Sequence, residues 1–433
     1  MSELKFSSKT ATILSLIGVA VGLGNMWRFP YMMGQYGGSA FLFIFLIFIF
    51  VFGIPALTAE LSLGRATGRG PVGALTQAFG AKLGKPIALF MVFTIFIANS
   101  YYLVVIANVV YSAYHGAVFG FLNEEHPISA GLGHHTIQFG IALFIICCCM
   151  LVVYKGVQNG IERVSVTMVP FFGLVMIYLI YHTLNLPGAL DYMMAFMKPD
   201  FSALNARNIF AAMGQAFFTL SLGGTLMVIY GNYVKDKESI PAMAISTGLG
   251  DLSAALLASL FIVPAVLVYG LDLEEGPMLL FSTLPSLFGQ MPGGTMLGTL
   301  FLVSLSFMAF LSSVATIQLF IMTMVDNTKI SFKKSIIIVG TVQAVAVSYC
   351  AFNPEIIGTL DLIFGSGMQV LGSCIAIIAV TIGLGKVVTM KQIFGDEKRG
   401  FHITYYNWLK FGVPTALIAT LLLYVYDTFN VGI

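Results

Sequence analysis

Four ionisable side chains lie inside long apolar stretches: Arg28, Glu60, Asp251 and Asp361. If these stretches cross a bilayer, an unpaired charge at the centre costs roughly 2.5 to 3.5 kcal/mol, so each group must face a partner, an ion or water. We therefore expect Arg28, Asp251 and Asp361 to be functional. Glu60 lies in the inner half of its stretch, and we expect it mainly to hold neighbouring backbone.

Two apolar stretches are interrupted near their middle. Residues 17–30 contain three glycines and Asn25, and residues 218–225 contain Gly223 and Gly224. Glycine costs about 1 kcal/mol in a helix interior, and lipid offers a freed backbone group no partner. A break supplies carbonyls for a cation and N–H groups for a carboxylate. Paired breaks favour a transporter built from inverted repeats; the alternative is that the glycines only allow close helix packing.

The composition excludes a water-soluble protein. Hydrophobic residues make up 58% of the 433 residues and charged residues only 9%, against about 25% in soluble domains. A net charge of +2 gives no reason to expect a nucleic-acid partner. The cysteines lie in apolar runs without metal-ligand spacing, so we interpret them as packing residues. We therefore expect an all-α integral membrane protein whose partner is the lipid bilayer.

Eleven stretches are predicted to cross the membrane, since each offers about 20 mostly apolar residues. They are 10–33, 38–64, 87–118, 135–154, 163–184, 206–233, 240–270, 293–325, 335–352, 355–384 and 409–427. The apolar stretch 277–290 is too short to cross and is predicted to be a re-entrant or surface hairpin. Because no loop is long enough for its own core, residues 1–433 are predicted to form one transmembrane domain.

Basic residues are distributed unevenly between the two sets of loops. With the N-terminus inside, all but three of the 21 Lys and Arg residues fall on the inner side; the exceptions are Arg28, Lys198 and Arg207. This asymmetry predicts a cytoplasmic N-terminus, and an odd number of spans then puts the C-terminus outside. The first apolar stretch lacks a small-residue cleavage site, so we interpret it as a retained helix.

The residues around both breaks resemble motifs of the neurotransmitter:sodium symporter family. Residues 18–31 read G-x-A-V-G-L-G-N-x-W-R-F-P-Y, and residues 214–223 read G-Q-A-F-F-T-L-S-L-G. Further matches follow in order at 53–65, 276–285 and 309–313. The resemblance covers the chain from about residue 6 to its C-terminus, and short bacterial amino-acid transporters of this family also have eleven helices.

This resemblance implies the fold and the location. It implies a LeuT-like 5+5 inverted repeat in which helices 1 and 6 are unwound at mid-membrane. The first repeat would be residues 1–184, the second 206–384, and 409–427 an additional helix. It also implies a multi-pass protein of the bacterial cytoplasmic (inner) membrane.

Two sodium sites are implied by the same resemblance. The first would use the Ala20 carbonyl and the side chains of Asn25, Thr219 and Asp251. The second would use the carbonyls of Gly18, Val21 and Ala309 and the hydroxyls of Ser312 and Ser313. Asp251 stands where a bacterial member has asparagine, and Ala255 stands near the position that often holds chloride. Because a fixed carboxylate can replace the charge of chloride, we predict no chloride requirement.

The substrate site is implied to lie between the breaks. Its residues would be Ala20, Leu23, Gly24, Ala98, Tyr102, Phe218, Thr219, Ser221, Gly224, Ser313 and Ile317. Amine transporters of the family carry an aspartate where this chain has Gly22, so an amino acid is expected rather than an amine. A bacterial member has bulkier residues at Ala98 and Gly224, which favours a large apolar or aromatic substrate here. A smaller neutral amino acid is the alternative.

Gate residues follow from the resemblance as well. Arg28 and Asp361 would form the outer ion pair above a lid of Tyr102 and Phe218. Tyr233 and Asp326 would belong to the inner gate; Asn327 is the other candidate for the acidic position, and Lys5 would stand in for the usual arginine. Gly160 and Pro170 have the spacing that lets helix 5 unwind.

We therefore expect sodium-coupled amino-acid symport into the cell by alternating access, with no obligate protein partner evident. A channel or uncoupled facilitator needs a continuous pore, whereas the gate residues favour occlusion. An intramembrane enzyme is disfavoured because the spans contain no His near a Ser or Cys, no His-Glu metal pattern and no recognisable aspartate dyad.

Overall fold

The computed structural model describes residues 5–198, 200–274, 276, 279–396 and 400–430. Within these residues, eight helices are long and apolar enough to cross a membrane, and a bent helix pair makes up to nine. The eight are Ser39–Thr67, Ala81–Phe119, His135–Tyr154, Val157–Leu184, Ile240–Val268, Gly294–Asn327, Phe332–Phe352 and Pro354–Gly383. This confirms an all-α membrane protein; the exact number of eleven spans stays a prediction.

The two predicted spans outside this set are built from shorter pieces. The sixth consists of α10 (Ala206–Thr219) and α11 (Leu226–Tyr233), separated by the second break. The last consists of α19 (Gly400–Asn407), a π-helical (wide) turn at Trp408–Gly412 and α20 (Val413–Asn430).

The first break lies where the glycine-rich motif predicts it. α1 (Lys9–Ala20) ends at Val21, whose backbone is extended, and a wide helical turn at Gly24–Arg28 leads into α2 (Phe29–Gln35). The two helical pieces are bent by 58°. The Gly22 N–H, which would bond the Gly18 carbonyl in a continuous helix, instead donates to Asn25 Oδ1 at 2.9 Å. Asn25 therefore stabilises the unwound chain.

The second break also lies where the sequence predicts it. Between α10 and α11, Ser221, Gly223 and Gly224 all have positive φ, at 51°, 146° and 69°. Such angles are uncommon for side-chain-bearing residues, which explains the glycines. The buried Glu60 accepts the Gly223 N–H at 3.0 Å, as expected for a residue that holds neighbouring backbone.

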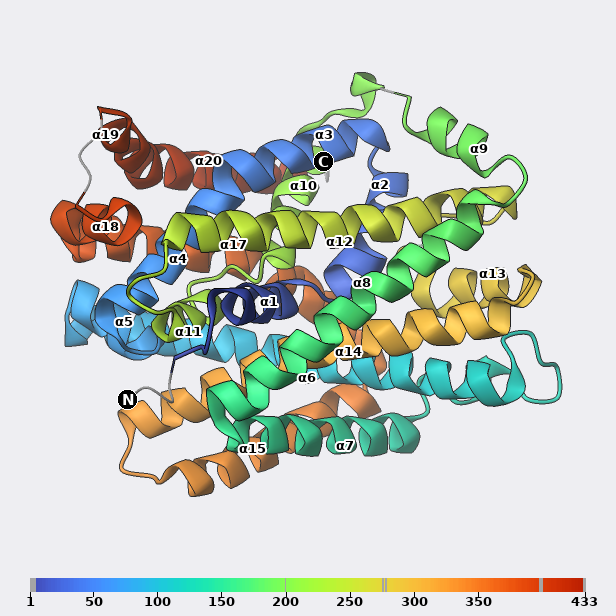
Figure 1. Ribbon diagram of the computed structural model, residues 1–433, viewed down its shortest axis with the longest axis horizontal. Helices are drawn as coiled ribbons and strands as arrows, with labels where there is room; N and C mark the ends of the chain where they lie inside the picture. The colour runs from blue at the N-terminus through green and yellow to red at the C-terminus, as the bar shows by residue number, and fades with distance from the viewer. Residues whose placement is uncertain (1–4, 199, 275, 277–278, 397–399, 431–433) are drawn as a thin grey trace.

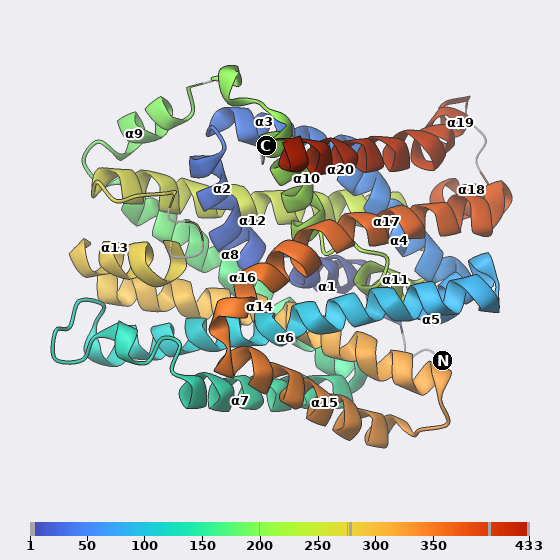
Figure 2. The same cartoon turned by 180° about the vertical axis from the view of Figure 1, so that it is seen from behind.

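Long helices surround the two breaks. Figure 1 shows α6 (Ala81–Phe119), α12 (Ile240–Val268) and α14 (Gly294–Asn327) running along the length of the molecule, with α1 near its centre. Both α12 and α14 contact α1. Figure 2, from behind, shows α17 (Met368–Ile378) and α6 covering the opposite side. α4 (Ile54–Thr67) packs closely against α11. Gly231 of α11 allows this approach, because any side chain there would overlap the Leu61 backbone.

Several elements differ from the sequence expectation at their ends. α6 begins at Ala81 rather than 87, because Lys82 and Lys85 end the apolar run but not the helix. Short helices form in the loops at Pro71–Phe79, Ala189–Phe196 and Gly385–Phe394. In the stretch 277–290, a wide turn at Leu279–Thr283 precedes α13 (Leu284–Gln290). Residues 277–278 of that stretch, and Lys398 and Arg399 of the charge pattern, lie outside the described residues.

Candidate functional site

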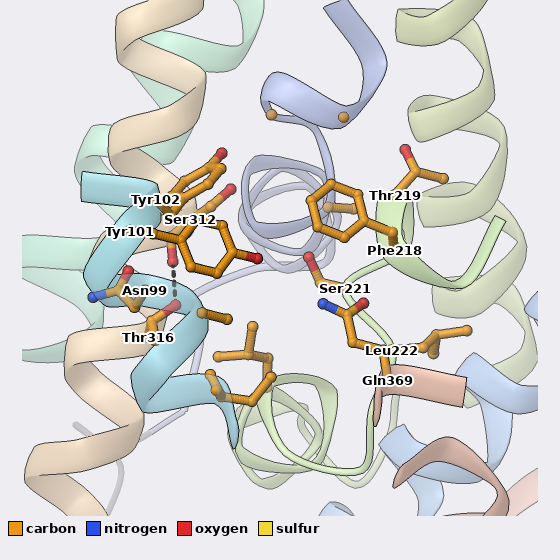
Figure 3. A pocket seen from close by; sticks show the side chains of 16 residues that line it. Asn99, Tyr101, Tyr102, Phe218, Thr219, Ser221, Leu222, Ser312, Thr316 and Gln369 are labelled. Atoms are coloured by element: carbon orange, nitrogen blue, oxygen red, sulfur yellow. Dashed lines mark hydrogen bonds between the residues drawn. The ribbon is translucent and has the colours of Figure 1, made fainter. Parts of the chain in front are cut away.

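A pocket lies between the two helix breaks (Figure 3). Its wall combines backbone of the first break, side chains of α6 and α14, and the second break. Among the residues of the predicted substrate and ion sites, it is lined by Ala20, Gly24, Ala98, Tyr102, Phe218, Thr219, Ser221 and Ser312. Segments about 200 residues apart in the chain therefore meet at one cavity, as the paired breaks predict.

Three side chains predicted for the first sodium site meet at one side of this pocket. Asn25 Nδ2 donates to Asp251 Oδ1 at 2.7 Å, and Thr219 Oγ1 donates to the same oxygen at 2.9 Å. Asp251 Oδ2 is buried and has no hydrogen-bond partner among the described residues. A buried carboxylate oxygen without a partner is costly. The oxygen ligands available here, from a carboxylate, an amide and a hydroxyl, fit a hard cation.

The residues predicted for the second sodium site lie where α1 meets α14. Ser312 Oγ donates to the Val19 carbonyl at 3.1 Å. Ser313 Oγ is fully buried and has no hydrogen-bond partner among the described residues. A Cβ on Gly18 would lie 2.9 Å from Leu311 Cδ1, so the end of α1 approaches α14 closely. Val21 and Ala309 are buried in the same core.

The residues predicted to bind the substrate differ in whether they line the pocket. The Leu23 N–H points at the Tyr102 hydroxyl at 3.4 Å, and the Ser221 hydroxyl donates to the Val19 carbonyl at 2.9 Å. Leu23, Gly224, Ser313 and Ile317 are not among the residues that line the pocket. A Cβ on Gly224 would face Gly372 O at 2.7 Å rather than the cavity.

The predicted outer gate residues lie together above the pocket. Arg28 Nη2 is 3.9 Å from Asp361 Oδ2, and the Arg28 guanidinium lies 4.6 Å from the centroid of the Phe218 ring. Contact of a guanidinium with an aromatic face is attractive. The Tyr101 hydroxyl donates to Asp361 Oδ1 at 3.0 Å. Arg28 is thus held between the carboxylate and the lid residue.

The predicted inner gate is arranged differently from a simple ion pair. Gln318 Nε2 donates to the Tyr233 hydroxyl at 2.8 Å, and Lys5 Nζ donates to the Val234 carbonyl at 2.9 Å. Within the described part of the chain, Lys5 forms no ion pair with Asp326, which instead lies against Gly70. Partial burial lowers the pKa of the Lys5 ammonium, although Asp236 acts in the opposite direction.

The predicted unwinding segment of helix 5 begins with a wide turn. Gly160 lies in the π-helical turn Val157–Glu162, and Pro170 lies inside α8 (Arg163–Leu184). Glu162, at the end of that turn, accepts the Ser7 N–H at 2.7 Å and also the Ser7 hydroxyl. The N-terminal segment is therefore bound directly to the start of helix 5.

Several polar residues at the pocket, the outer gate and the first break lie outside the sequence prediction. Tyr101 binds Asp361, and Gln215 Nε2 donates to the Gly24 carbonyl at 2.8 Å. Asn99 and Gln369 line the pocket. Asn99, Gln215 and Gln369 can be noticed as polar residues within apolar spans. The sequence prediction misses them because it looks for charged side chains, and an amide is uncharged.

Comparison with known proteins identifies the family of this chain. The profile of the Sodium:neurotransmitter symporter family matches residues 4–121 and 121–429. The chain is 30% identical to YhdH of Bacillus subtilis, described as an uncharacterized sodium-dependent transporter, over 98% of each chain. It is 29% identical to an uncharacterized sodium-dependent transporter of Methanocaldococcus jannaschii, covering 95% of this chain and 86% of that protein.

A solved structure agrees with the fold. The crystal structure of MhsT in complex with L-phenylalanine superposes with a TM-score of 0.88 at 28% identity, covering 97% of this chain and 99% of MhsT. The LeuT-like fold expected from the sequence is therefore confirmed. The chain belongs to the Sodium:neurotransmitter symporter family and is a multi-pass membrane protein that acts as a sodium-dependent symporter rather than an enzyme.

Proposed function

We propose that this chain imports a neutral L-amino acid with a large hydrophobic or aromatic side chain together with Na⁺, by alternating access. The observation that carries the proposal is the pocket between the two helix breaks, next to the cluster of Asn25, Thr219 and Asp251. Na⁺ at this cluster would supply positive charge beside the substrate carboxylate. A second Na⁺ would bind at Gly18, Val21, Ala309, Ser312 and Ser313.

The backbone ends at the breaks would hold the amino-acid group. The Leu23 and Gly24 N–H groups and the Tyr102 hydroxyl would bind the carboxylate, and the carbonyls of the breaks would bind the ammonium. A Cβ on Gly22 would come within 2.8 Å of the Tyr102 hydroxyl and 3.2 Å of Ser312 Oγ. Gly22 itself supplies no side-chain carboxylate at this position, so a substrate amine that lacks its own carboxylate would lack a partner.

Transport without chloride follows from the charge of Asp251. This carboxylate lies beside the proposed ion and is buried. It would supply a negative charge next to Na⁺ without chloride, in contrast to relatives described as sodium- and chloride-dependent, such as the human creatine transporter, which is 26% identical over 74% of this chain.

Alternating access would use the two ends of the pocket. Arg28, Asp361, Tyr102 and Phe218 would close the outer side, while Tyr233 and Asp326 would control the inner side. Unwinding between Gly160 and Pro170 would admit water to the second ion. We infer that residues 1–184 and 206–384 are the inverted repeats, that 409–427 is the additional helix, and that the N-terminus is cytoplasmic in a bacterial inner membrane.

The side-chain preference is inferred from the pocket wall. Ile95, Ala98, Leu222 and Leu226 give it an apolar surface, which suits a hydrophobic or aromatic side chain. MhsT, with a similar fold, was crystallised with L-phenylalanine. A smaller neutral amino acid is the alternative, because Gly224, expected to enlarge the site, does not line the cavity.

Uptake into proteoliposomes tests this function. Radiolabelled Trp should accumulate only with an inward Na⁺ gradient, and unlabelled large neutral amino acids should compete better than Ala or Gly. Replacing chloride by gluconate should leave the rate unchanged. Sodium-independent, non-saturating flux would instead favour a channel or uncoupled facilitator, and competition by Ala alone would favour the smaller substrates.

A further inference from the structure

One polar side chain in the pocket wall has no hydrogen-bond partner among the residues that the structure describes. Gln369, on α17, lines the cavity and is 8% exposed. Assuming the amino-acid transport proposed above, we propose that Gln369 determines specificity: its amide selects an aromatic substrate with a hydrogen-bonding group at the far end of its ring, which tyrosine fits best.

The position of Gln369 is fixed by close backbone packing. If Gly223 carried a Cβ, that atom would lie 3.5 Å from Gln369 Cα. A Cβ added to Gly372, one turn further along α17, would overlap the Gly223 backbone. α17 therefore lies directly against the second break. The Gln369 side chain starts at this contact and ends beside Ser221 at the cavity, as Figure 3 shows.

The amide of Gln369 is available for a ligand. Its Oε1 is buried without a hydrogen-bond partner, and the side chain makes no hydrogen bond to the residues that the structure describes. Most buried polar side-chain atoms in proteins have a partner. An amide that faces a substrate cavity and lacks one is explained if the substrate supplies the missing hydrogen bonds.

Two other polar side chains of the wall, Thr316 and Asn99, already donate hydrogen bonds within the protein. Thr316 Oγ1 donates to the Ser312 carbonyl at 2.8 Å, so its proton is used within α14. Asn99 Nδ2 donates to Gln343 Oε1 at 3.3 Å, and Figure 3 shows the Asn99 amide group on the side of the cavity opposite Gln369. Asn99 Oδ1 has no hydrogen-bond partner in the described part of the chain, so Asn99 is the competing candidate and must be tested alongside.

The chemistry of the amide matches a phenol. An amide offers both a donor and an acceptor, and a phenolic hydroxyl can bond to both. The rest of this wall, including Ile95, Leu222 and Leu226, is apolar and suits the ring. Phenylalanine would leave the amide unpaired; tryptophan could satisfy only the acceptor through its indole N–H. The expected order is tyrosine, then tryptophan, then phenylalanine.

Competition against Na⁺-dependent binding of labelled tyrosine tests this order. Wild-type protein should bind tyrosine about three- to tenfold more tightly than phenylalanine, as expected for one or two net hydrogen bonds. 4-Methylphenylalanine has nearly the shape of tyrosine without its hydroxyl and should compete no better than phenylalanine. If it competes as well as tyrosine, size rather than hydrogen bonding sets the preference, and the proposal is overturned.

A variant series assigns the preference to one residue. Gln369→Met is similar in shape but lacks the amide, and it should bind tyrosine and phenylalanine equally. Gln138→Met is the matched control, because Gln138 is also a buried glutamine with an unpartnered Oε1, on α7 (His135–Tyr154) away from the pocket. It should keep the tyrosine preference. If Asn99→Leu removes the preference and Gln369→Met does not, Gln369 is not the selecting residue.

The outcomes separate this proposal from the function on which it rests. If no amino acid binds wild-type protein with Na⁺, the proposed function fails. If amino acids bind with Na⁺ but phenylalanine equals or exceeds tyrosine, the function holds and the assignment of Gln369 is wrong. The comparison within wild-type protein needs no variant, so it decides the point even if Gln369→Met does not fold.

Discussion

Asn25 and Asp251 are joined by two hydrogen bonds from one amide group, across 226 residues of sequence. Asn25 Nδ2 donates to the Asp251 carboxylate at 2.7 Å and to its backbone carbonyl at 3.1 Å. The other end of the same amide holds the Gly22 N–H. A single side chain therefore links the unwound part of the first span to α12, and the position of the carboxylate depends on the conformation of the break.

Removing the charge of Asp251 should weaken sodium binding. Asp251→Asn keeps the side-chain size but loses the negative charge, and interactions of a charged group are worth about 1.5 to 3 kcal/mol. The Na⁺ concentration for half-maximal tryptophan binding should therefore rise about ten- to hundredfold. Glu60→Gln is the control, because its amide oxygen can still accept the Gly223 N–H. An unchanged Na⁺ dependence in Asp251→Asn would contradict the proposed ion site.

Ser221 should show the energetic cost of its backbone angle. It is the non-glycine residue with positive φ in the described chain, at 51°, and its hydroxyl joins the second break to Val19 near the end of α1. Ser221→Ala and Ser221→Gly both lose this hydrogen bond, but only glycine removes the cost of a left-handed residue, about 1 to 2 kcal/mol. Thermal unfolding in detergent should show Ser221→Gly to be more stable than Ser221→Ala. Equal stability would mean that the break is not strained here.

The sequence could predict the two breaks because they depend on local chemistry, whereas the members of the ion cluster are implied by the family resemblance. Three glycines and Asn25 weaken a helix wherever it packs, and a buried aspartate in lipid must find a partner. Asn25, Thr219 and Asp251 accordingly meet. The pairing of Arg28 with Asp361 is implied by the family resemblance, and the two side chains lie 3.9 Å apart.

Other features could not be predicted because they depend on orientation. The backbone at Gly224 has a φ of 69° and directs a hypothetical side chain toward α17. The presence of a glycine in the sequence does not reveal this direction. Gln369 is one polar residue in an apolar span, and only the packing of α17 on Gly223 directs it to the pocket. Lys5 binds a carbonyl rather than Asp326 because the short N-terminal segment lies along the end of α11.

Gly224 should tolerate no side chain, whatever the substrate. A Cβ there meets the Gly372 carbonyl at 2.7 Å, and backbone cannot move aside as a flexible side chain can. Gly68 is the matched control, because its φ of 62° is similar and a Cβ there meets nothing within 4 Å. Gly224→Ala should be destabilised by about 1 to 3 kcal/mol more than Gly68→Ala, and binding of all amino acids should fall together. Selective loss of aromatic substrates would instead show that position 224 faces the pocket.

The contact between Ser7 and Glu162 should hold the inner side of the protein closed. Glu162 accepts two hydrogen bonds from Ser7, while Phe6 N–H binds the Tyr233 carbonyl. The N-terminal segment thus bridges the end of α11 and the wide turn that contains Gly160. If that turn unwinds during transport, this bridge must break first, so weakening it should favour the inward-open state.

Variants at these two residues should speed substrate release in a graded way. Ser7→Ala keeps the backbone N–H contact and should raise the dissociation rate of bound tryptophan about threefold; Glu162→Ala loses both contacts and should raise it about tenfold. Lys9→Ala, at an exposed neighbouring position, should leave the rate unchanged. High Na⁺ should slow release in every variant, since ions and substrate stabilise the same occluded state. If Glu162→Ala releases substrate no faster than wild type, the contact is structural and does not control inner opening.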